Sequence, residues 1–437
     1  MHILYHAITR GGYAKRPSCI ARRPFSLISF IFYDFNFLIY ITHNIWYNPI
    51  RYAYLCIILP VLGIYAGEKR MMNELGLTES GADAVLGEDL EDIAAKPLPF
   101  ERMKGSTIVV TGATGLVGSM LVRSLACINR VHGLGMTIIP LIRSLKKAEG
   151  MFGQLLYRKD IRVICADVTD PLDIEGSVDF IIHCASVTAS KTFVSKPVET
   201  IETSIRGTEN ILKLAREKQI KSMVYISSME AFGITDPGLD RIREEDLGYI
   251  DVTNVRSSYS EGKRMCELLC TCYAYEYGVP VKAARLAQTF GAGVPAEESR
   301  VFAQFIKSAM AGEDIVLHTR GESFGNYCYT ADAVYGILTI LLLGEHSNVY
   351  TVVNPETTIR IKDMAAMVAE SFSQGRSKVV FDIPVDAGMY GYAPDVTMHL
   401  CADKLMTLGW KPVYGLYDMY KRMKDSWESR KDKGEIE

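Results

Sequence analysis

The sequence lacks the patterns that mark metal-binding, repetitive and nucleic-acid-binding proteins. Its ten cysteines are scattered and form no paired C-x-x-C clusters with zinc spacing. It contains no internal repeat and no low-complexity tract. Residues 1–70 hold eight Lys or Arg and two Asp or Glu, which leaves 40 basic and 49 acidic residues, a net charge of −9, after Arg70. This acidic body does not favour a nucleic-acid partner, and no metal site is expected.

The length of 437 residues, 48% of them hydrophobic, suffices for two or three domains or for one large α/β domain with an annex. Four of the cysteines, Cys127, Cys165, Cys184 and Cys266, lie within apolar runs. We therefore expect these thiols to be buried as small hydrophobic groups in a protein of a reducing compartment.

Two apolar runs lie in the first seventy residues. The runs 25–41 and 53–67 are apolar and aromatic, but the first contains Asp34 and the second is short for a membrane span of about 20 residues. "GEKR" just before Met71 can be encoded by a purine-rich stretch like a bacterial ribosome-binding site. We favour the interpretation that residues 1–70 are upstream sequence translated from a start codon assigned too early, and a membrane anchor is the alternative.

A strand, a glycine-rich turn and a helix follow one another from residue 107. "TIVV" (107–110) predicts a strand, and the pattern that continues through Cys127 predicts a helix. Gly112 permits a tight turn, Gly115 lets backbone N–H groups approach a pyrophosphate, and Gly118 permits close helix–strand packing. This context, more than the G-x-x-G-x-x-G spacing alone, predicts a dinucleotide-binding turn.

Alternating strands and helices continue along the chain. Strands are predicted at 136–142, 161–168, 178–186, 221–228 and 279–288, with a helix at 208–219. Apolar strands bounded by helices predict a doubly wound parallel sheet that binds its ligands at the carboxyl ends of the strands. Further on, 325–345 predicts a loop and a buried helix, 359–372 predicts another helix, and 408–412 predicts a turn.

Several short motifs occur in an order that resembles the extended short-chain dehydrogenase/reductases, the NAD-dependent epimerase/dehydratase family. They are Gly112–Gly118, "ADV" (166–168), "HCAS" (183–186), "GTEN" (207–210), "SSMEAFG" (227–233) and "YSEGK" (259–263). The resemblance covers about residues 104–425. It implies a Rossmann fold with a smaller C-terminal α/β substrate lobe, a retained NAD cofactor and a nucleotide-sugar substrate.

The resemblance also implies a role for each matching residue. Tyr259 would be the acid/base at a sugar hydroxyl, and Lys263, one helical turn away, would favour its phenolate and hold the nicotinamide ribose. Ser228 would hydrogen-bond the reacting oxygen, whereas His183 is expected to pack at a strand end. The implied cofactor-binding residues are Gly112, Thr114, Gly115, Leu116, Val117, Gly118, Arg143, Asp167, Val168, Ala185, Ser186, Tyr259 and Lys263.

The cofactor is expected to be NAD, with NADP as the alternative. Asp167 matches the family's adenine contact, but the second strand ends in "PLIRS". Arg143 therefore stands where an acidic residue often selects NAD by binding the ribose 2′-hydroxyl. An arginine there could accept a 2′-phosphate or stack on adenine.

The "SSMEAFG" segment bears on which reaction is expected. Members of the family oxidise C4 of a sugar and then epimerise it, eliminate water across C5 and C6, or release CO2 from a C6 carboxylate. The 4,6-dehydratases carry Asp-Glu after the Ser/Thr, but here the Asp position is Met229. Ser228-Met229-Glu230 and "YSEGKR" resemble UDP-glucuronate decarboxylases. We therefore expect a decarboxylase-like enzyme in which Glu230 is catalytic, although Glu230 could instead form a surface salt bridge.

Other activities remain open at this point. The alternatives are a nucleotide-sugar 4-epimerase, a 4,6-dehydratase, an NADPH-dependent ketone reductase and a non-catalytic dinucleotide-binding protein. Two departures from the family lie in the substrate half. Gly325 and Tyr327 replace an Arg-x-Phe whose arginine binds the diphosphate, and Gln288 replaces an asparagine. Positive charge for the diphosphate could then come from Arg285, Arg300 or Arg320.

The expected organisation has five parts. They are the segment 1–70, a helical lead-in at 71–103, a NAD-binding Rossmann domain at 104–290, an interleaved substrate lobe at 291–425 and a charged tail at 426–437. The apolar segment 265–278 supports a homodimer formed by paired helices, although it could simply pack on the sheet. A cytoplasmic location is expected, and membrane contact only if 25–67 is genuine.

Overall fold

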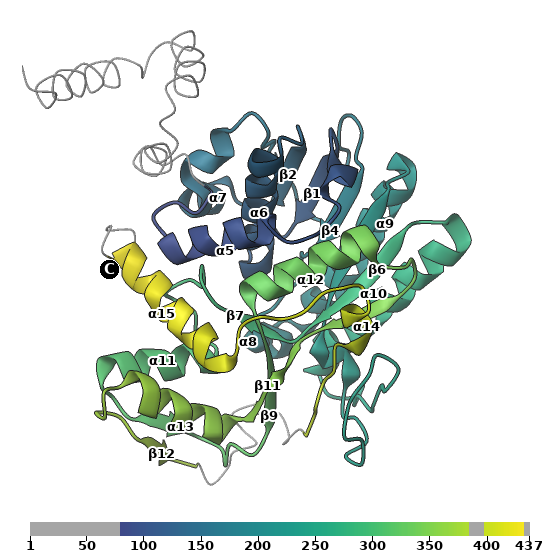
Figure 1. Cartoon of the computed structure of the whole chain (residues 1–437). Coiled ribbons are helices and arrows are strands. Elements are labelled where there is room, and N and C mark those ends of the chain that lie inside the picture. Colours follow the sequence, from purple (N-terminus) through teal and green to yellow (C-terminus); the bar gives the residue numbers. More distant parts are fainter. Residues whose placement is uncertain (1–78, 384–396, 432–437) are drawn as a thin grey trace, which may run out of the picture. The chain divides into compact units, whose positions relative to one another are not determined.

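The computed structural model describes residues 79–383 and 397–431, all within the compact unit of residues 71–437 (Figure 1). The runs 25–41 and 53–67, and with them the hypotheses about residues 1–70, lie outside the described residues. Within the described ranges, no helix has both the length and the apolar character that crossing a bilayer requires.

A seven-stranded parallel sheet forms the centre of the unit. Its strands are β1 (Thr107–Thr111), β2 (Thr137–Ile142), β3 (Ile164–Cys165), β4 (Phe180–His183), β5 (Ser222–Ser228), β6 (Val281–Leu286) and β10 (Val349–Val352). Their order is β10-β6-β5-β4-β1-β2-β3, and every neighbouring pair is parallel. The predicted doubly wound sheet is confirmed.

Helices cover both faces of this sheet (Figure 1). α6 (Leu116–His132) and α12 (Thr330–Leu343) pack on one face, with α5 (Ala84–Ala94) beside them, and α9 (Pro197–Lys218) and α10 (Ser257–Tyr277) pack on the other. Successive residues of β1 show why, because Ile108 and Val110 join the core of the first face and Val109 joins that of the second. Strands that are apolar on both sides need both layers.

Two predictions near the edge of the sheet are wrong. The strand predicted at 161–168 is reduced to the two residues of β3. β3 is the terminal strand and pairs only with the end of β2, so little hydrogen bonding extends it. For the same reason Cys165 is exposed. Cys184, just after β4, is only half-buried, whereas Cys127 and Cys266 are buried as predicted.

The C-terminal part adds a smaller lobe. It contains β7 (Gln288–Phe290), α11 (Val301–Ala311), β8 (Ile315–Leu317), β9 (Phe324–Tyr329), β11 (Asn354–Arg360), α13 (Ile361–Phe372), β12 (Val379–Phe381) and α15 (Leu416–Lys431), whereas α14 (Asp403–Met406) packs on β10 of the central sheet. β11, β9 and β7 form one sheet, and β12 and β8 form another. The loop predicted at the start of 325–345 is wrong, because β9 forms there between two partners that are distant in sequence.

Two helices extend beyond the predicted limits. α9 begins at Pro197, well before residue 208, and a proline is well suited to the first turn of a helix. α15 passes through the boundary predicted at residue 425, and Ser426 and Trp427 are buried. Ser426 donates a hydrogen bond of 2.5 Å to Asp83, which caps α5. The described ranges also contain short helices at Phe100–Met103, Leu145–Phe152 (α7), Gly153–Tyr157, Ser190–Ser195 (α8) and Met229–Phe232.

The strand order reverses at β1. From β1 the chain builds the sheet outward through β2 and β3, then returns to β4 on the other side and continues through β5 and β6. The loops that follow β1 and β4 therefore separate at the carboxyl edge of the sheet. This reversal point is where open α/β sheets bind their ligands.

Candidate active site

The turn after β1 is so tight that Gly112 and Gly118 cannot carry a side chain. Gly112 has a φ of +61°, and a Cβ there would lie 2.7 Å from the backbone nitrogen of Ala185. A Cβ on Gly118 would lie 2.3 Å from the carbonyl oxygen of Gly112. Gly115 is exposed and immediately precedes α6. The first N–H groups of α6 thus face a cradle without bulky side chains, which fits the pyrophosphate of a dinucleotide.

The other predicted residues of this cradle surround the turn. Thr114, Leu116 and Val117 are half-buried at the start of α6. Ala185, after β4, donates its backbone N–H to Thr111 Oγ1 at 3.1 Å. The neighbouring Ser186 donates its hydroxyl to the carbonyl of Val187 at 3.2 Å. The loops after β1 and β4 are therefore directly tied together.

His183 is a packed neutral histidine, as predicted. Its Nδ1 lies 2.7 Å from Thr111 Oγ1, and its Nε2 lies 3.3 Å from Thr208 Oγ1. Burial and the nearby charge of Lys263 lower the pKa of His183 to about 3. The ring therefore carries no charge at neutral pH and links β1 and β4 to α9.

The "GTEN" motif has a structural explanation. A Cβ on Gly207 would lie 2.9 Å from Cγ2 of Val168, so glycine lets α9 approach the loop after β3. Asn210 donates to the backbone carbonyls of Val168 at 2.9 Å and Asp170 at 3.0 Å. The motif thus holds the loop that carries Asp167.

Arg143 and Asp167, which are far apart in the sequence, lie next to each other in the fold. Nη1 of Arg143 is 3.8 Å from Oδ2 of Asp167, and the arginine side chain is 74% exposed. Hydrogen bonds from the backbone and hydroxyl of Thr169 lower the pKa of Asp167, and Arg143 contributes in the same direction. The two residues form one polar pair at the carboxyl ends of β2 and β3.

Ser228, Tyr259 and Lys263 converge at the end of β5. Ser228 is the last residue of the strand; its hydroxyl accepts from the Glu230 N–H at 3.2 Å and lies near enough to the phenol of Tyr259 to lower its pKa. The Tyr259 ring stacks on Phe193 with a centroid distance of 4.3 Å and an interplanar angle of 8°. Lys263 lies one turn further along α10 and donates from Nζ to the carbonyl of Ile226 at 2.8 Å.

Burial dominates the protonation of both groups. It raises the pKa of Tyr259 to about 12, while the Ser228 hydroxyl and the charge of Arg300 act in the opposite direction. It lowers the pKa of Lys263 to about 8. Lys263 Nζ lies 5.6 Å from the centroid of the Tyr259 ring. The phenol is therefore protonated at neutral pH, and phenolate would require further positive charge.

Glu230 is held beside this group by two residues that the sequence analysis did not identify. Nη1 of Arg256 is 3.1 Å from Oε2, and Nη2 is 3.3 Å from Oε1. Ser260 donates to Oε2 at 3.1 Å. Glu230 and Arg256 are both about 30% exposed, at 29% and 31%. The spacing of Arg256 and Ser260, four residues apart just before and within α10, could have indicated that they face the same neighbour.

The three arginines that could bind the diphosphate have different surroundings in the structure. Arg285 is 3% exposed and pairs with the buried Glu267 at 2.7 Å, so it is engaged within the core. Arg300, 45% exposed, is the candidate whose charge affects Tyr259. Arg320 lies near Glu322.

Position 325 explains one departure from the family. A Cβ on Gly325 would lie 2.3 Å from the Tyr327 hydroxyl, so the tyrosine ring fills the place of a side chain there. Gln288 is exposed at the start of β7, close in sequence to the end of β6. In the described ranges, no group of three or more His, Cys, Asp or Glu residues could hold a metal ion.

Comparison with known proteins identifies the family. The sequence model of the NAD dependent epimerase/dehydratase family matches residues 108–354. UDP-glucuronic acid decarboxylase 1 of Danio rerio is 29% identical over 312 residues, which cover 71% of this chain and 69% of that protein. UDP-glucuronic acid decarboxylase 6 of Arabidopsis thaliana is 28% identical over 324 residues, covering 74% and 89%.

A solved structure shares the fold. The dTDP-glucose 4,6-dehydratase DesIV of Streptomyces venezuelae, crystallised with NAD, superimposes with a TM-score of 0.61 at 20% identity. The match covers 74% of this chain and 98% of that one. Because the family model spans more than half of the sequence, and the glycine cradle fits a dinucleotide, the chain belongs to the NAD-dependent epimerase/dehydratase family.

Proposed function

We propose that this chain is a nucleotide-sugar decarboxylase that acts on UDP-glucuronate and uses NAD as a retained cofactor. The observation that carries the proposal is the Glu230 carboxylate, which Arg256 and Ser260 hold next to the Ser228–Tyr259 pair. The names of the relatives with 28–29% identity support the same reaction.

We assign the first step to Tyr259, Ser228 and Lys263. Bound NAD would supply reversible hydride transfer at C4 of the sugar. Tyr259 accepts the proton of the C4 hydroxyl, and Ser228 hydrogen-bonds the same oxygen. Lys263 contributes positive charge and binds the ribose. Because burial raises the pKa of Tyr259 to about 12, the reaction needs the additional positive charge that the oxidised cofactor brings.

The second step releases the C6 carboxylate as CO2. The electron pair of the C5–C6 bond moves toward the C4 ketone, and C5 is then protonated. We assign Glu230 to orienting the sugar at C5 and to relaying to C5 a proton taken from solvent water. Met229, at the position of the dehydratase acid, packs against the core and has no proton to donate. The site thus favours loss of CO2 over loss of water.

We further propose that Arg300 replaces the diphosphate-binding arginine of the family. Gly325 cannot be substituted by arginine without displacing Tyr327. Arg285 is committed to Glu267. Arg300 also pairs with a carboxylate, Glu298 at 2.7 Å, but unlike Arg285 it is 45% exposed, and its charge acts on Tyr259, so it can still bind a diphosphate in the substrate pocket. The Arg143–Asp167 pair, together with Val168 and the glycine cradle, forms our proposed adenosine end of the cofactor site.

The dimer is also part of the proposal. Four apolar side chains on α9 and α10 are exposed: Val198 (64%), Ile201 (40%), Met265 (49%) and Leu268 (55%). We expect two copies to pair through these helices. We also propose that the protein is cytoplasmic and that its two interleaved domains occupy 104–290 and 291–425. Light scattering should give a dimer for wild type and a monomer for Leu268→Asp. A wild-type monomer would contradict the interface.

The decisive experiment is NMR of the purified chain incubated separately with UDP-glucuronate, UDP-glucose and dTDP-glucose. Bicarbonate together with UDP-xylose or a 4-keto pentose is the expected result. A 4-epimer or a 4-keto-6-deoxy product would contradict decarboxylation but leave the hydride chemistry at Tyr259 intact. Stoichiometric consumption of added NADPH would indicate a ketone reductase. No turnover of any substrate would favour a binding protein.

A further inference from the structure

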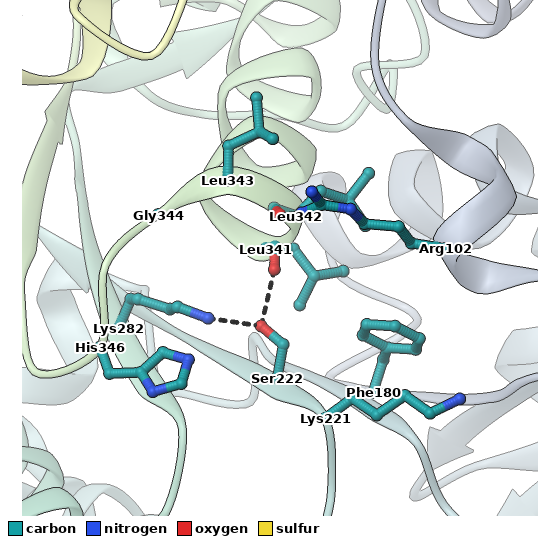
Figure 2. A pocket seen from close by; sticks show the side chains of 10 residues that line it. All are labelled: Arg102, Phe180, Lys221, Ser222, Lys282, Leu341, Leu342, Leu343, Gly344 and His346. Atoms are coloured by element: carbon teal, nitrogen blue, oxygen red, sulfur yellow. Dashed lines mark hydrogen bonds between the residues drawn. The ribbon is translucent and has the colours of Figure 1, made fainter.

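A second polar site lies at the opposite edge of the central sheet (Figure 2). A cavity of about 480 Å³ is lined by Arg102, Phe180, Lys221, Ser222, Lys282, Leu341, Leu342, Leu343, Gly344 and His346. Ser222 begins β5 and Ser228 ends it, so at about 3.3 Å per residue the cavity lies roughly 20 Å from the reaction site. It is a separate site.

The lining of this cavity is one-sided in charge. Four of its ten residues are basic or histidine, and none is acidic. Lys221 is already neutralised at the rim, where its Nζ lies 2.9 Å from Asp179. Lys282 and His346 lie on one side of Ser222 and Arg102 on the other (Figure 2). Positive charge therefore reaches the cavity from both sides.

Lys282 is the most buried of these cations. It is 3% exposed, and its Nζ donates one hydrogen bond, of 2.7 Å, to Ser222 Oγ. An ammonium group has three donors, and no further acceptor for it is found among the described residues. Burial without a neighbouring carboxylate lowers the pKa of Lys282 to about 8. A buried ammonium without an anion is costly, so an anionic ligand would complete it.

Lys282 is not needed to cap the C-terminal end of α12. The last carbonyls of this helix are already satisfied by other donors. Ser222 donates to Leu341 at 2.6 Å, Arg102 donates to Leu342 at 2.8 Å, and the Gly344 N–H bonds the carbonyl of Ile340 at 3.0 Å. The negative end of a helix amounts to roughly half a charge, whereas Lys282 and Arg102 bring two full positive charges. The cavity remains net positive.

We propose that this cavity binds a small oxyanion of the phosphate class, with Lys282 as its main charged ligand. Arg102 retains free guanidinium N–H groups that can bind the same anion from the opposite side. His346 lies close to Lys282, and burial, together with the charge of Lys282, lowers the pKa of His346. The volume exceeds that of inorganic phosphate, so the phosphate group of a small ester also fits.

The proposal is tested by calorimetry, in which inorganic phosphate is titrated into the full-length protein. The protein is first saturated with NAD, so that the glycine cradle is filled. Wild type is expected to bind one phosphate per chain, and Lys282→Met is expected to weaken binding at least about tenfold, the loss of one charge-assisted hydrogen bond. Lys213→Met, an exposed lysine on α9 paired with Glu209, serves as the control and should bind like wild type. Absence of saturable binding to wild type, or equal affinity of Lys282→Met, would overturn the proposal.

A measurement on wild type decides the matter if Lys282→Met does not fold. Acetic anhydride transfers an acetyl group to a neutral lysine amine and releases acetate, and peptide mass spectrometry gives the rate at each lysine. Phosphate is expected to slow acetylation of Lys282 relative to Lys213. A rate at Lys282 that phosphate leaves unchanged would refute the site.

Discussion

Arg256 contacts both carboxylate oxygens of Glu230, at 3.1 and 3.3 Å, from a position just before α10. Tyr259 follows three residues later on that helix. The segment that presents the proposed acid/base therefore also fixes the carboxylate proposed to act at C5. A planar guanidinium that binds both oxygens sets the direction of the carboxylate as well as its charge.

Arg256→Lys is expected to lower decarboxylation of UDP-glucuronate by about 10- to 100-fold, because one ammonium cannot hold both oxygens of Glu230. The rate of CO2 release measures the effect. Glu230→Gln should show a similar loss while NAD is still reduced in a single turnover. Arg241→Lys is the matched control, because Arg241 pairs with Asp403 at 2.6 Å on the surface. Equal rates in Arg256→Lys and wild type would remove Glu230 from the mechanism.

Tyr259→Phe is expected to reduce turnover by about 10²- to 10⁴-fold, the usual contribution of a general acid or base. The ring should still stack on Phe193, so the unfolding transition should change little. Turnover and NAD reduction are measured together. Tyr275→Phe, which changes a side chain 94% exposed on the same helix, should leave both unchanged. Normal NAD reduction by Tyr259→Phe would show that another group takes the proton.

Gly118→Ala is expected to weaken NAD binding and to destabilise the fold by about 1–3 kcal/mol, because the new methyl group would lie 2.3 Å from the Gly112 carbonyl oxygen. Urea unfolding and calorimetry with NAD measure the two effects. Gly150→Ala, in α7, is the control, because no atom lies within 4 Å of its Cβ position. That variant should be slightly more stable than wild type. Wild-type affinity for NAD in Gly118→Ala would argue against the cradle.

The lowered pKa of Lys282 predicts that the stability of the folded protein depends on pH. Its folded pKa of about 8 lies below the 10.5 of a free lysine, so the unfolded chain binds more protons between these values. The free energy of unfolding of wild type, relative to that of Lys282→Met, should therefore rise by about 2 kcal/mol between pH 7.5 and pH 9.5 in phosphate-free buffer. Urea unfolding at both pH values measures this difference. A constant difference would mean that Lys282 is solvated in the folded protein.

Much of the cofactor half was predictable because its signals are local. A strand, three glycines and a helix within about twenty residues report their own geometry, and Gly112 and Gly118 do occupy positions that exclude a side chain. Tyr259 and Lys263 share a helix face wherever that helix lies. The strand at 324–329 was missed because its partners, β7 and β11, are supplied by other parts of the chain.

The sequence by itself determined the family, the doubly wound sheet and the Tyr259–Lys263 pair, because each depends on spacing along a few neighbouring residues. Only the tertiary structure decided which charges meet. It placed Arg256 on Glu230, buried Arg285 against Glu267, joined Arg143 to Asp167 and left Lys282 without a carboxylate partner among the described residues. Coulombic interactions and desolvation depend on distances between segments far apart in the chain, and folding alone sets those distances.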